Sequence, residues 1–180
     1  MRVRRENAAA LIIDIQEKLF PVMAGKEELL SYCLKLIKGL QFLGIPLVVT
    51  QQYSKGLGAT IPEISSVIPG FSFIEKRDFS CCGEPAVLSR LGELGAKNII
   101  ICGIESHVCV LQTALDLKEA GFTPVVVMDA VSSRFPANLE LAKERFRYES
   151  IMMTSTESLL FELTGSSSAP EFKAISSLVK

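Results

Sequence analysis

The sequence has one histidine, no tryptophan and almost no excess of either charge. Nineteen Lys and Arg residues stand against twenty Asp and Glu residues, which gives a formal net charge of −1. Without a basic excess the chain lacks the electrostatic attraction that binds a phosphate backbone, so we expect no nucleic-acid partner. A single histidine leaves little material for a histidine-based metal site. The GxGxxG and GxxxxGK patterns of nucleotide sites are also missing, so we expect neither a metal nor an organic cofactor.

Long apolar runs are missing as well. The longest ones, at 8–13, 99–104 and 125–128, are far shorter than the roughly 20 residues of a membrane helix, so we expect no membrane partner. The basic start of the chain leads directly into a strand-like run and does not resemble a signal peptide. The five cysteines form no CxxC pair and no regular framework. That usage is typical of free thiols in a reducing compartment, and we expect a cytoplasmic protein.

The sequence does contain an alternation of short apolar runs and longer segments with helical periodicity. Its 180 residues are 48% hydrophobic and 22% charged, as in one globular domain. The apolar runs predict six strands, at 8–15, 47–50, 71–75, 98–104, 122–128 and 150–154. Most segments between them predict helices, at 26–43, 84–94, 108–120 and 137–148, whereas 55–70 is predicted to be a long loop. Strands that are apolar on both faces and separated by helices predict an α/β fold, a doubly wound six-stranded parallel sheet with helices on both faces.

The C-terminal end is predicted to be an appendage. We expect one domain over residues 1–165 and an extension over residues 166–180, joined by a Ser-rich link. The extension carries Phe172, Ile175 and Leu178 at helical spacing. Such a helix can pack on its own chain or on a second copy, and the sequence leaves both options open.

Candidate catalytic residues follow three of the predicted strands, where ligands bind in open parallel sheets. Asp14 follows the first strand, Lys76 the third and Cys109 the fourth. A thiol at the start of a helix is predicted to have a lowered pKa, because the helix dipole and a nearby lysine favour the thiolate. A carboxylate beside both can accept the thiol proton and later deliver it to a leaving amine.

The segments around these residues resemble the signatures of the isochorismatase-like cysteine hydrolases. They are LIIDIQ around Asp14, FIEKRDFS around Lys76 and ICGIESHVCVLQTA around Cys109, and the resemblance covers roughly residues 8–163. It implies a Rossmann-like three-layer sandwich and a triad at the carboxyl edge of the sheet. In that triad Asp14 is the general base and acid, Lys76 holds the ion network, and Cys109 attacks a carbonyl.

The resemblance carries two further implications. A cis peptide is expected between Ile104 and Glu105, and the N–H groups of Glu105 and Cys109 are expected to form an oxyanion hole. Family members commonly form dimers or larger assemblies, so we expect a homo-oligomer.

Departures from the family pattern narrow the substrate class. Many nicotinamidases of the family carry a metal-binding Asp-x-His segment where this chain has Gln51, Gln52 and Tyr53, which disfavours a metal and nicotinamide. Cys109 favours an amide over the vinyl ether of isochorismatases, and the segment around it most resembles the isochorismatase domain-containing proteins. The predicted function is metal-free cleavage of a C–N bond in a small molecule. Two alternatives stay open: a ligand-binding or interaction protein with little turnover, and a hydrolase of an ester or ether.

Four further residues are candidates for the wall of a substrate pocket: Gln16, Phe20, Tyr53 and His107. Gln16 and Phe20 follow the first strand and fit a pocket or a packing role equally well. Tyr53 takes the place that a metal ligand occupies in relatives. His107 lies two residues before Cys109, a spacing that favours a position at the pocket rim over a catalytic Cys–His pair.

The remaining cysteines and the segment after the fifth strand have simpler assignments. Cys33 and Cys102 fall in apolar stripes and are assigned to the core, whereas the adjacent Cys81 and Cys82 receive no role. Four polar residues are expected to follow the fifth strand and to organise the turn into the next helix: Asp129, Ser132, Ser133 and Arg134.

Overall fold

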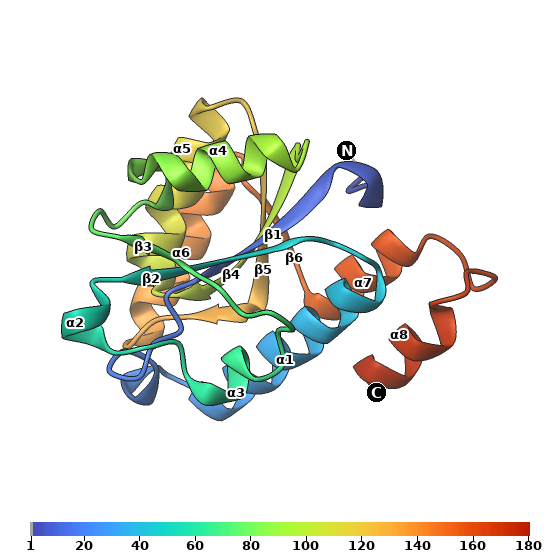
Figure 1. Cartoon of the computed structure of the whole chain (residues 1–180), viewed down its shortest axis with the longest axis horizontal. Helices are drawn as coiled ribbons and strands as arrows, with labels where there is room; N and C mark the ends of the chain where they lie inside the picture. Colours follow the sequence, from blue (N-terminus) through green and yellow to red (C-terminus); the bar gives the residue numbers. More distant parts are fainter. Residues whose placement is uncertain (1) are drawn as a thin grey trace.

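The computed structural model describes residues 2–180 and shows a parallel sheet between two layers of helices (Figure 1). The sheet has six strands in the order β3-β2-β1-β4-β5-β6, and every neighbouring pair is parallel. This confirms the predicted fold class. The strands are β1 (Ala8–Ile13), β2 (Leu47–Gln52), β3 (Ile74–Lys76), β4 (Asn98–Ile104), β5 (Thr123–Ser132) and β6 (Met152–Thr154).

The helices lie on both faces of the sheet. One layer contains α1 (Lys26–Phe42), α7 (Thr156–Thr164) and α8 (Phe172–Val179). The other contains α4 (Pro85–Glu93), α5 (Leu111–Glu119) and α6 (Pro136–Tyr148). Single turns complete the connections: η1 (Arg5–Asn7), η2 (Phe20–Val22), η3 (Cys81–Gly83), the π-turn η4 (Ser106–Val110), α2 (Ser54–Leu57) and α3 (Pro62–Ser65). The segment 55–70, predicted to be a loop, thus contains helical turns that its Gly and Pro residues keep short.

Two separate cores form because successive strand residues point to opposite faces of the sheet. Ala10 and Ile12 of β1 pack against the α1 layer, whereas Leu11 and Ile13 pack against the α5 layer. All six residues of β1 are buried. This explains why the strand is a continuous apolar run rather than an alternating one.

The strand order places a ligand-binding position between β1 and β4. Read across the sheet from the β3 edge, the strand numbers fall from β3 to β1 and then rise from β4 to β6. The direction in which strands are added therefore reverses between β1 and β4. Open α/β sheets bind ligands beyond the carboxyl ends of the strands at such a switch point. Asp14 directly follows β1, and Cys109 lies in the turn after β4.

Gly103 allows β4 to approach β1 closely at this edge. It pairs with Ile13 and has a φ of 119°, in the region that favours glycine. A Cβ atom built on Gly103 would lie 2.1 Å from the carbonyl oxygen of Ile13. No side chain fits there, so the glycine brings the two carboxyl ends together just before the segment with Cys109.

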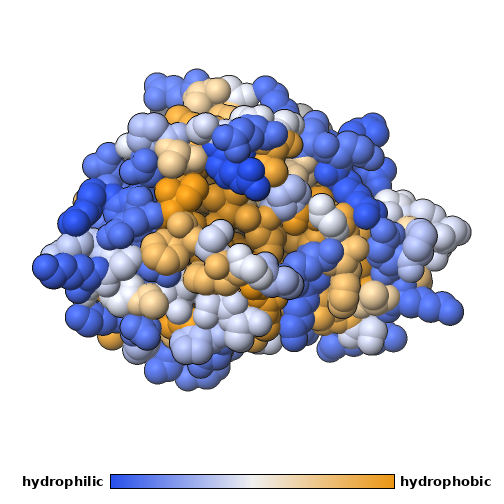
Figure 2. Space-filling model, in the orientation of Figure 1, coloured by the Kyte–Doolittle hydropathy of each residue, from blue (hydrophilic) through white to orange (hydrophobic). Residues whose placement is uncertain are grey.

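The edge strand β3 is shorter than predicted. It begins at Ile74 rather than Phe71, because Phe71 packs on the α1 core and its ring lies 6.3 Å from that of Phe73. A cavity of about 370 Å³ remains along the first half of β2 and is lined in part by Val48 and Phe73. Figure 2 shows hydrophobic residues gathered in a hollow near the middle of this face.

Strand β5 is longer than predicted and continues to Ser132. Asp129 and Ser132 therefore lie within the strand, which corrects their assignment to the turn after it. The register with β4 shifts between Ile101 and Gly103, which accommodates extra β5 residues. Asp129 accepts hydrogen bonds from the N–H and Oγ1 of Thr156, at 2.9 and 2.8 Å, and so holds the start of α7.

The C-terminal helix α8 packs on its own chain. Ile175 is fully buried in the α1 core, and the rings of Phe161 and Phe172 lie 6.2 Å apart. Arg5 pairs with Glu171 at 2.9 Å. The structure therefore realises the first of the two options that the sequence left open for this segment.

Candidate active site

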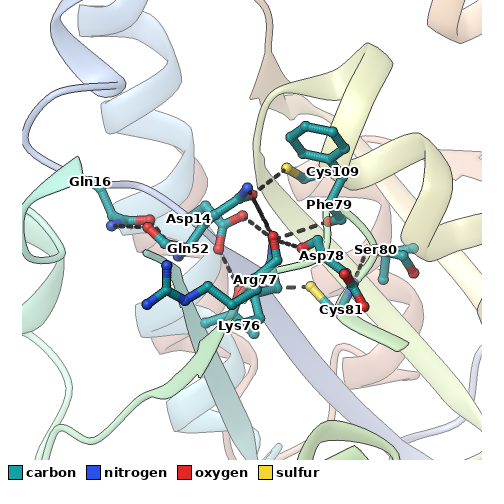
Figure 3. Close-up of polar contacts among 12 residues, drawn as sticks. Asp14, Gln16, Gln52, Lys76, Arg77, Asp78, Phe79, Ser80, Cys81 and Cys109 are labelled. Atoms are coloured by element: carbon teal, nitrogen blue, oxygen red, sulfur yellow. Dashed lines mark hydrogen bonds and ion pairs between the residues drawn. The ribbon is translucent and has the colours of Figure 1, made fainter. Parts of the chain in front are cut away.

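Asp14 binds partners from two neighbouring strands (Figure 3). It has a φ of 52° and is completely buried. Thr50 of β2 donates a hydrogen bond to Oδ1 at 2.8 Å, and Lys76 Nζ lies 2.7 Å from Oδ2. Within residues 2–180, Oδ2 accepts no well-directed hydrogen bond. The carboxylate thus has one oxygen fixed by a hydroxyl and one paired with a cation and still able to accept a proton.

Lys76 carries a buried ammonium surrounded by oxygen atoms. Besides Asp14, it contacts Gln52 Oε1 at 3.1 Å and the carbonyl oxygens of Asp78 and Phe79 at 3.1 and 3.0 Å. Its side chain has no exposed surface. These oxygens replace the water that burial removes, so the site holds a stable positive charge.

The pKa of Lys76 reflects a competition between burial and the acidic groups around it. Burial alone would lower it, but Asp14, Cys81 and Cys109 together raise it above the ordinary lysine value. The ammonium therefore persists at neutral pH despite its burial.

Cys109 faces the same group of residues from the opposite side of the switch point. It lies in the π-turn η4, directly before α5, and its thiol donates a hydrogen bond to Gln52 Oε1 at 3.4 Å. The structure thus brings Asp14, Lys76 and Cys109 together from positions 14, 76 and 109 of the chain.

The predicted lowering of the Cys109 pKa is wrong for this resting structure. Burial raises the pKa of the thiol to about 12, and the Asp14 carboxylate raises it further than Lys76 lowers it. The expectation considered the helix start and the lysine but not burial or the closeness of the carboxylate. Cys109 is therefore a neutral thiol at neutral pH and needs a base at the moment of attack.

A second thiol, that of Cys81, lies close to Asp14 and Lys76. Cys81 is fully buried, and its sulfur lies 3.7 Å from Thr50 Oγ1. Because the Thr50 hydroxyl donates to Asp14, the Cys81 thiol is the donor in this contact. Burial, reinforced by Asp14, raises the pKa of Cys81 to about 12. Cys81 is therefore an uncharged neighbour that supports the carboxylate through Thr50.

Only Cys109 reaches the surface from this group, with 6% of its area exposed, against 0% for Asp14 and 1% for Lys76. Phe79 lies beside it in the loop that follows β3 and is 53% exposed. A cavity of about 400 Å³ borders the same loop, with Phe79 and Ser80 in its wall. This cavity therefore lies next to the loop that carries Phe79.

Glu105 begins the turn that carries Cys109. The peptide between Ile104 and Glu105 is cis, as the family resemblance implied. The Glu105 carboxylate accepts hydrogen bonds from the N–H and Nε of Arg134, at 2.9 and 3.2 Å, and so joins this turn to the segment after β5. Its carbonyl accepts from the N–H groups of Val108 and Val110, at 3.1 and 3.2 Å.

Gln16 holds the main chain at the end of β2. It is fully buried, and its side-chain oxygen accepts from the N–H of Gln52 at 2.7 Å. Its amide nitrogen donates to the carbonyls of Gln52 and Gly58, at 3.0 and 2.7 Å. The amide is thus occupied by main-chain groups and fixes the end of β2.

The other three predicted wall residues contact other parts of the chain. Phe20 is half-buried in η2 and packs against the α1 core. Tyr53 is exposed and stacks with Arg77, whose guanidinium carbon lies 4.2 Å from the ring centre.

Both ring nitrogens of His107 have partners. Nδ1 lies 2.9 Å from Ser133 Oγ, and Nε2 lies 3.2 Å from Asn138 Nδ2. With Asn138 as the donor, Nε2 is an acceptor and Nδ1 carries the proton. The imidazole therefore joins η4 to the segment after β5, and the structure gives it no contact with Cys109.

Three residues of the site were missed by the sequence analysis: Thr50, Gln52 and Cys81. Thr50 and Gln52 are two residues apart on β2 and so lie on the same face, whereas Gln51 between them donates to Thr60 Oγ1 at 2.9 Å. Polar residues at alternate positions near the end of an apolar strand are the signal that could have identified the first two.

The described residues contain neither a cluster of metal ligands nor a helix able to span a membrane. Nowhere in residues 2–180 do three or more His, Cys, Asp or Glu side chains gather in an arrangement able to hold a metal ion. None of the helices in this part of the chain combines the length and apolar character needed to cross a bilayer.

Comparison with known proteins identifies the family. Residues 8–158 match the family described as Isochorismatase domain, so the chain belongs to the isochorismatase-like hydrolase family. Isochorismatase domain-containing protein 2A of Mus musculus is 34% identical over 180 residues, which cover 99% of this chain and 85% of the mouse protein. The secreted isochorismatase effector Isc1 of Phytophthora sojae is 36% identical over 184 residues, covering 99% of this chain and 87% of the effector.

A solved structure has the same architecture. MAR1 ribonuclease from Caenorhabditis elegans matches with a TM-score of 0.92 and 34% identity, over 99% of this chain and 92% of that chain. The shared fold extends over the C-terminal segment as well as the sheet.

Proposed function

We propose that the chain is a cysteine hydrolase that cleaves a C–N bond of a small amide, with Asp14, Lys76 and Cys109 as its catalytic residues. The observation that supports this most is the convergence of a thiol, a buried carboxylate with one free acceptor position and a buried ammonium at the switch point. A nucleophile, a base and a cation close together are the groups that covalent acyl transfer requires.

The first half-reaction forms a thioester. The Cys109 sulfur attacks the amide carbonyl carbon while its proton moves to Asp14 Oδ2. Lys76 stays protonated and stabilises the negative charge that develops on sulfur, in line with its lowering effect on the pKa of Cys109. The carbonyl oxygen becomes an oxyanion, for which we propose the N–H groups of Glu105 and Cys109 as donors. Asp14 then returns the proton to the leaving nitrogen as the C–N bond breaks.

The second half-reaction regenerates the enzyme. Water attacks the thioester carbon, and Asp14 accepts a proton from that water. Collapse of the tetrahedral intermediate breaks the C–S bond, and Asp14 returns its proton to sulfur. The products are a carboxylic acid and ammonia or an amine, and Cys109 is again a neutral thiol.

Ammonia release from a panel of small primary amides tests this proposal. We expect turnover of at least one amide by the parent chain and by Cys33→Ala, and a loss of about 10³-fold or more in Cys109→Ala. Parallel panels of small esters and vinyl ethers cover the alternative hydrolytic reactions. Ester or ether turnover without ammonia release would contradict the proposed bond type, and ligand binding without any product would favour a binding protein.

A second candidate activity is RNA cleavage, because a relative of 34% identity is described as a ribonuclease. The charge distribution disfavours it, since the net charge is −1 and the basic cluster of Arg2, Arg4 and Arg5 precedes β1, at the amino edge of the sheet. Incubation with single-stranded RNA at low and high salt tests this directly. Cleavage that disappears in Cys109→Ala would favour the ribonuclease activity over the amidase.

The partners that we propose are a small-molecule substrate and further copies of the chain, in a cytoplasmic setting and without nucleic acid. Exposed apolar residues on and before α6 support self-association, with Phe135, Leu141 and Tyr148 each more than 60% exposed. Free thiols at all five cysteines support a reducing compartment. Sedimentation velocity of the parent chain and of a Leu141→Glu variant tests the assembly.

A further inference from the structure

The side-chain oxygen of Gln52 stands between the proposed nucleophile and its cation. It accepts from the Cys109 thiol at 3.4 Å and from Lys76 at 3.1 Å (Figure 3). A substrate carbonyl would have to come within about 3.5 Å of the same sulfur to be attacked. The Gln52 amide therefore occupies space that a substrate amide needs.

The main chain of Gln52 is fixed, whereas its side chain is held by polar contacts alone. Gln16 binds both its N–H and its carbonyl, at 2.7 and 3.0 Å. At the far end of the side chain, the amide nitrogen makes one long hydrogen bond to the carbonyl of Arg77, at 3.4 Å. The residue is half-buried. Its carboxamide can thus leave the sulfur by side-chain rotation while the strand keeps its position.

The thiol proton has a second acceptor close by. Asp14 Oδ2 is fully buried and accepts no well-directed hydrogen bond in the described chain, although the catalytic scheme requires it to take this proton. In the resting structure the Cys109 sulfur lies 3.4 Å from Gln52 Oε1, which accepts from the thiol. An acceptor for S–H stabilises the neutral thiol, so Gln52 and Asp14 compete for the proton.

We infer that Gln52 is a positioning residue that holds Cys109 in its inactive thiol form until a substrate amide displaces the Gln52 carboxamide. Displacement frees the S–H group to turn to Asp14 Oδ2, to which the proton moves as sulfur attacks. Gln52 itself gains and loses no proton. This inference rests on the proposed function, because it describes how the same triad becomes active.

The charged and titratable groups around Cys109 come from three other elements. They are Asp14 after β1, Lys76 at the end of β3 and Cys81 in η3. Of these groups, Lys76 also contacts residue 52, since its Nζ lies 3.1 Å from Gln52 Oε1. A changed pH profile in a Gln52 variant therefore reports the loss or gain of the contacts that residue 52 makes with Cys109 and Lys76.

The test measures the iodoacetamide alkylation rate of Cys109 by mass spectrometry from pH 6.5 to 10. Gln52→Met keeps the length of the side chain and removes the acceptor, so we expect alkylation about fivefold faster at pH 8. Gln52→Glu keeps the shape and adds a negative charge beside the sulfur. We therefore expect the alkylation rate to fall to about one fifth of the parent rate or below. Gln112→Met, an exposed glutamine on α5, is the matched control and should behave as the parent chain.

The outcomes separate this inference from the proposed function. Opposite shifts in Gln52→Met and Gln52→Glu support it. If Asp14→Asn changes the profile but both Gln52 variants match the parent chain, the role of Gln52 is wrong and the triad stands. If Asp14→Asn also leaves the profile unchanged, the triad and the Gln52 inference both fail. Thermal unfolding of each variant checks that it is folded, and Gln52→Glu still decides the question if Gln52→Met does not fold.

Discussion

Each helical layer of the molecule buries a pair of thiols, and the two pairs have different surroundings. Cys33 and Cys102 lie on the α1 side, and Cys81 and Cys109 lie on the α5 side. The pKa of Cys33 is raised well above its usual value by a hydrogen bond with Cys102 and by burial, and its sulfur also contacts the carbonyl of Ala130 at 3.5 Å. Burial is likewise the largest cause of the raised pKa of Cys109.

The difference between the pairs is the charge around them. Lys76 lowers the pKa of Cys81 and Cys109, whereas no cation is among the groups that shift the pKa of Cys33. Cys109 also lies next to Asp14, a base that can take its proton. Burial therefore does not separate the proposed nucleophile from the other thiols of this chain. Nearby Lys76 and Asp14 set Cys81 and Cys109 apart from Cys33. Exposure then sets Cys109 apart from Cys81, with 6% of its area exposed against 0%.

The largest expected effect is the difference between two alanine substitutions. Cys109→Ala removes the nucleophile and should lower amide turnover by about 10³-fold or more. Cys33→Ala removes a buried thiol that has no partner in the triad, so turnover should stay within about twofold of the parent value. Steady-state ammonia release from both variants measures this difference. Equal losses in the two variants would show that the thiols act only through folding.

Loss of the cation should have the next largest effect. Lys76→Met leaves the Asp14 carboxylate buried without its partner, which costs about 3–5 kcal/mol of unfolding free energy. The double variant Asp14→Asn/Lys76→Met removes both charges and should recover part of that loss. Urea unfolding measures both values. A cost below about 1 kcal/mol for Lys76→Met would contradict the buried ion pair.

Alkaline pH should destabilise the fold through the buried thiols. Cys81 and Cys109 have pKa values near 12 in the native chain, above the value of about 8.5 in an unfolded chain. Their folded pKa is raised, so their contribution to stability is complete below the unfolded pKa and is lost as pH rises towards 12. Each thiol lowers the free energy of unfolding by up to about 1.4 kcal/mol per pH unit in that window.

Unfolding in urea at pH 8, 9, 10 and 11 measures this loss. The slope should become shallower in Cys33→Ala, because the raised pKa of Cys33 contributes in the same direction. A free energy of unfolding that stays constant from pH 9 to pH 11 would contradict the raised pKa values.

The smallest expected effect concerns the hydroxyl that holds Asp14. Thr50→Val keeps the shape of the side chain but removes the hydrogen bond to Oδ1, at a cost of about 1–3 kcal/mol in stability. Turnover should fall about tenfold, because the carboxylate is less well positioned. Thr154→Val on β6, outside the triad, serves as the control. Unchanged turnover in Thr50→Val would remove Thr50 from the catalytic arrangement.

The sequence predicts the elements and the three central residues for simple physical reasons. Apolar strands separated by amphipathic helices determine a parallel three-layer fold, and polar residues directly after such strands collect at one edge. The strand order could not be predicted, because periodicity contains no information on which strands pair. The start of β3 could not be predicted either, because the choice of Phe71 between strand and core depends on tertiary packing.

The chemistry at the site depends on distances that the sequence does not contain. The contact of Gln52 with both Lys76 and Cys109 requires the register between β2 and β3. The raised pKa of Cys109 depends on how deeply the thiol is buried and how close Asp14 lies. The helix position and the neighbouring residue types alone predicted a lowered pKa for Cys109, which is the opposite direction.

The most direct test of the account is the alkylation rate of Cys109 in the parent chain and in Asp14→Asn, resolved from the other cysteines by mass spectrometry. The account predicts that the parent rate rises about tenfold per pH unit from pH 7 to beyond pH 9 without a plateau. It also predicts that Asp14→Asn reacts faster at pH 8, because the carboxylate no longer opposes the thiolate, while Cys33 stays unreactive in both. A parent plateau below pH 8.5, or equal rates in the two chains, would contradict the coupling of Cys109 to Asp14.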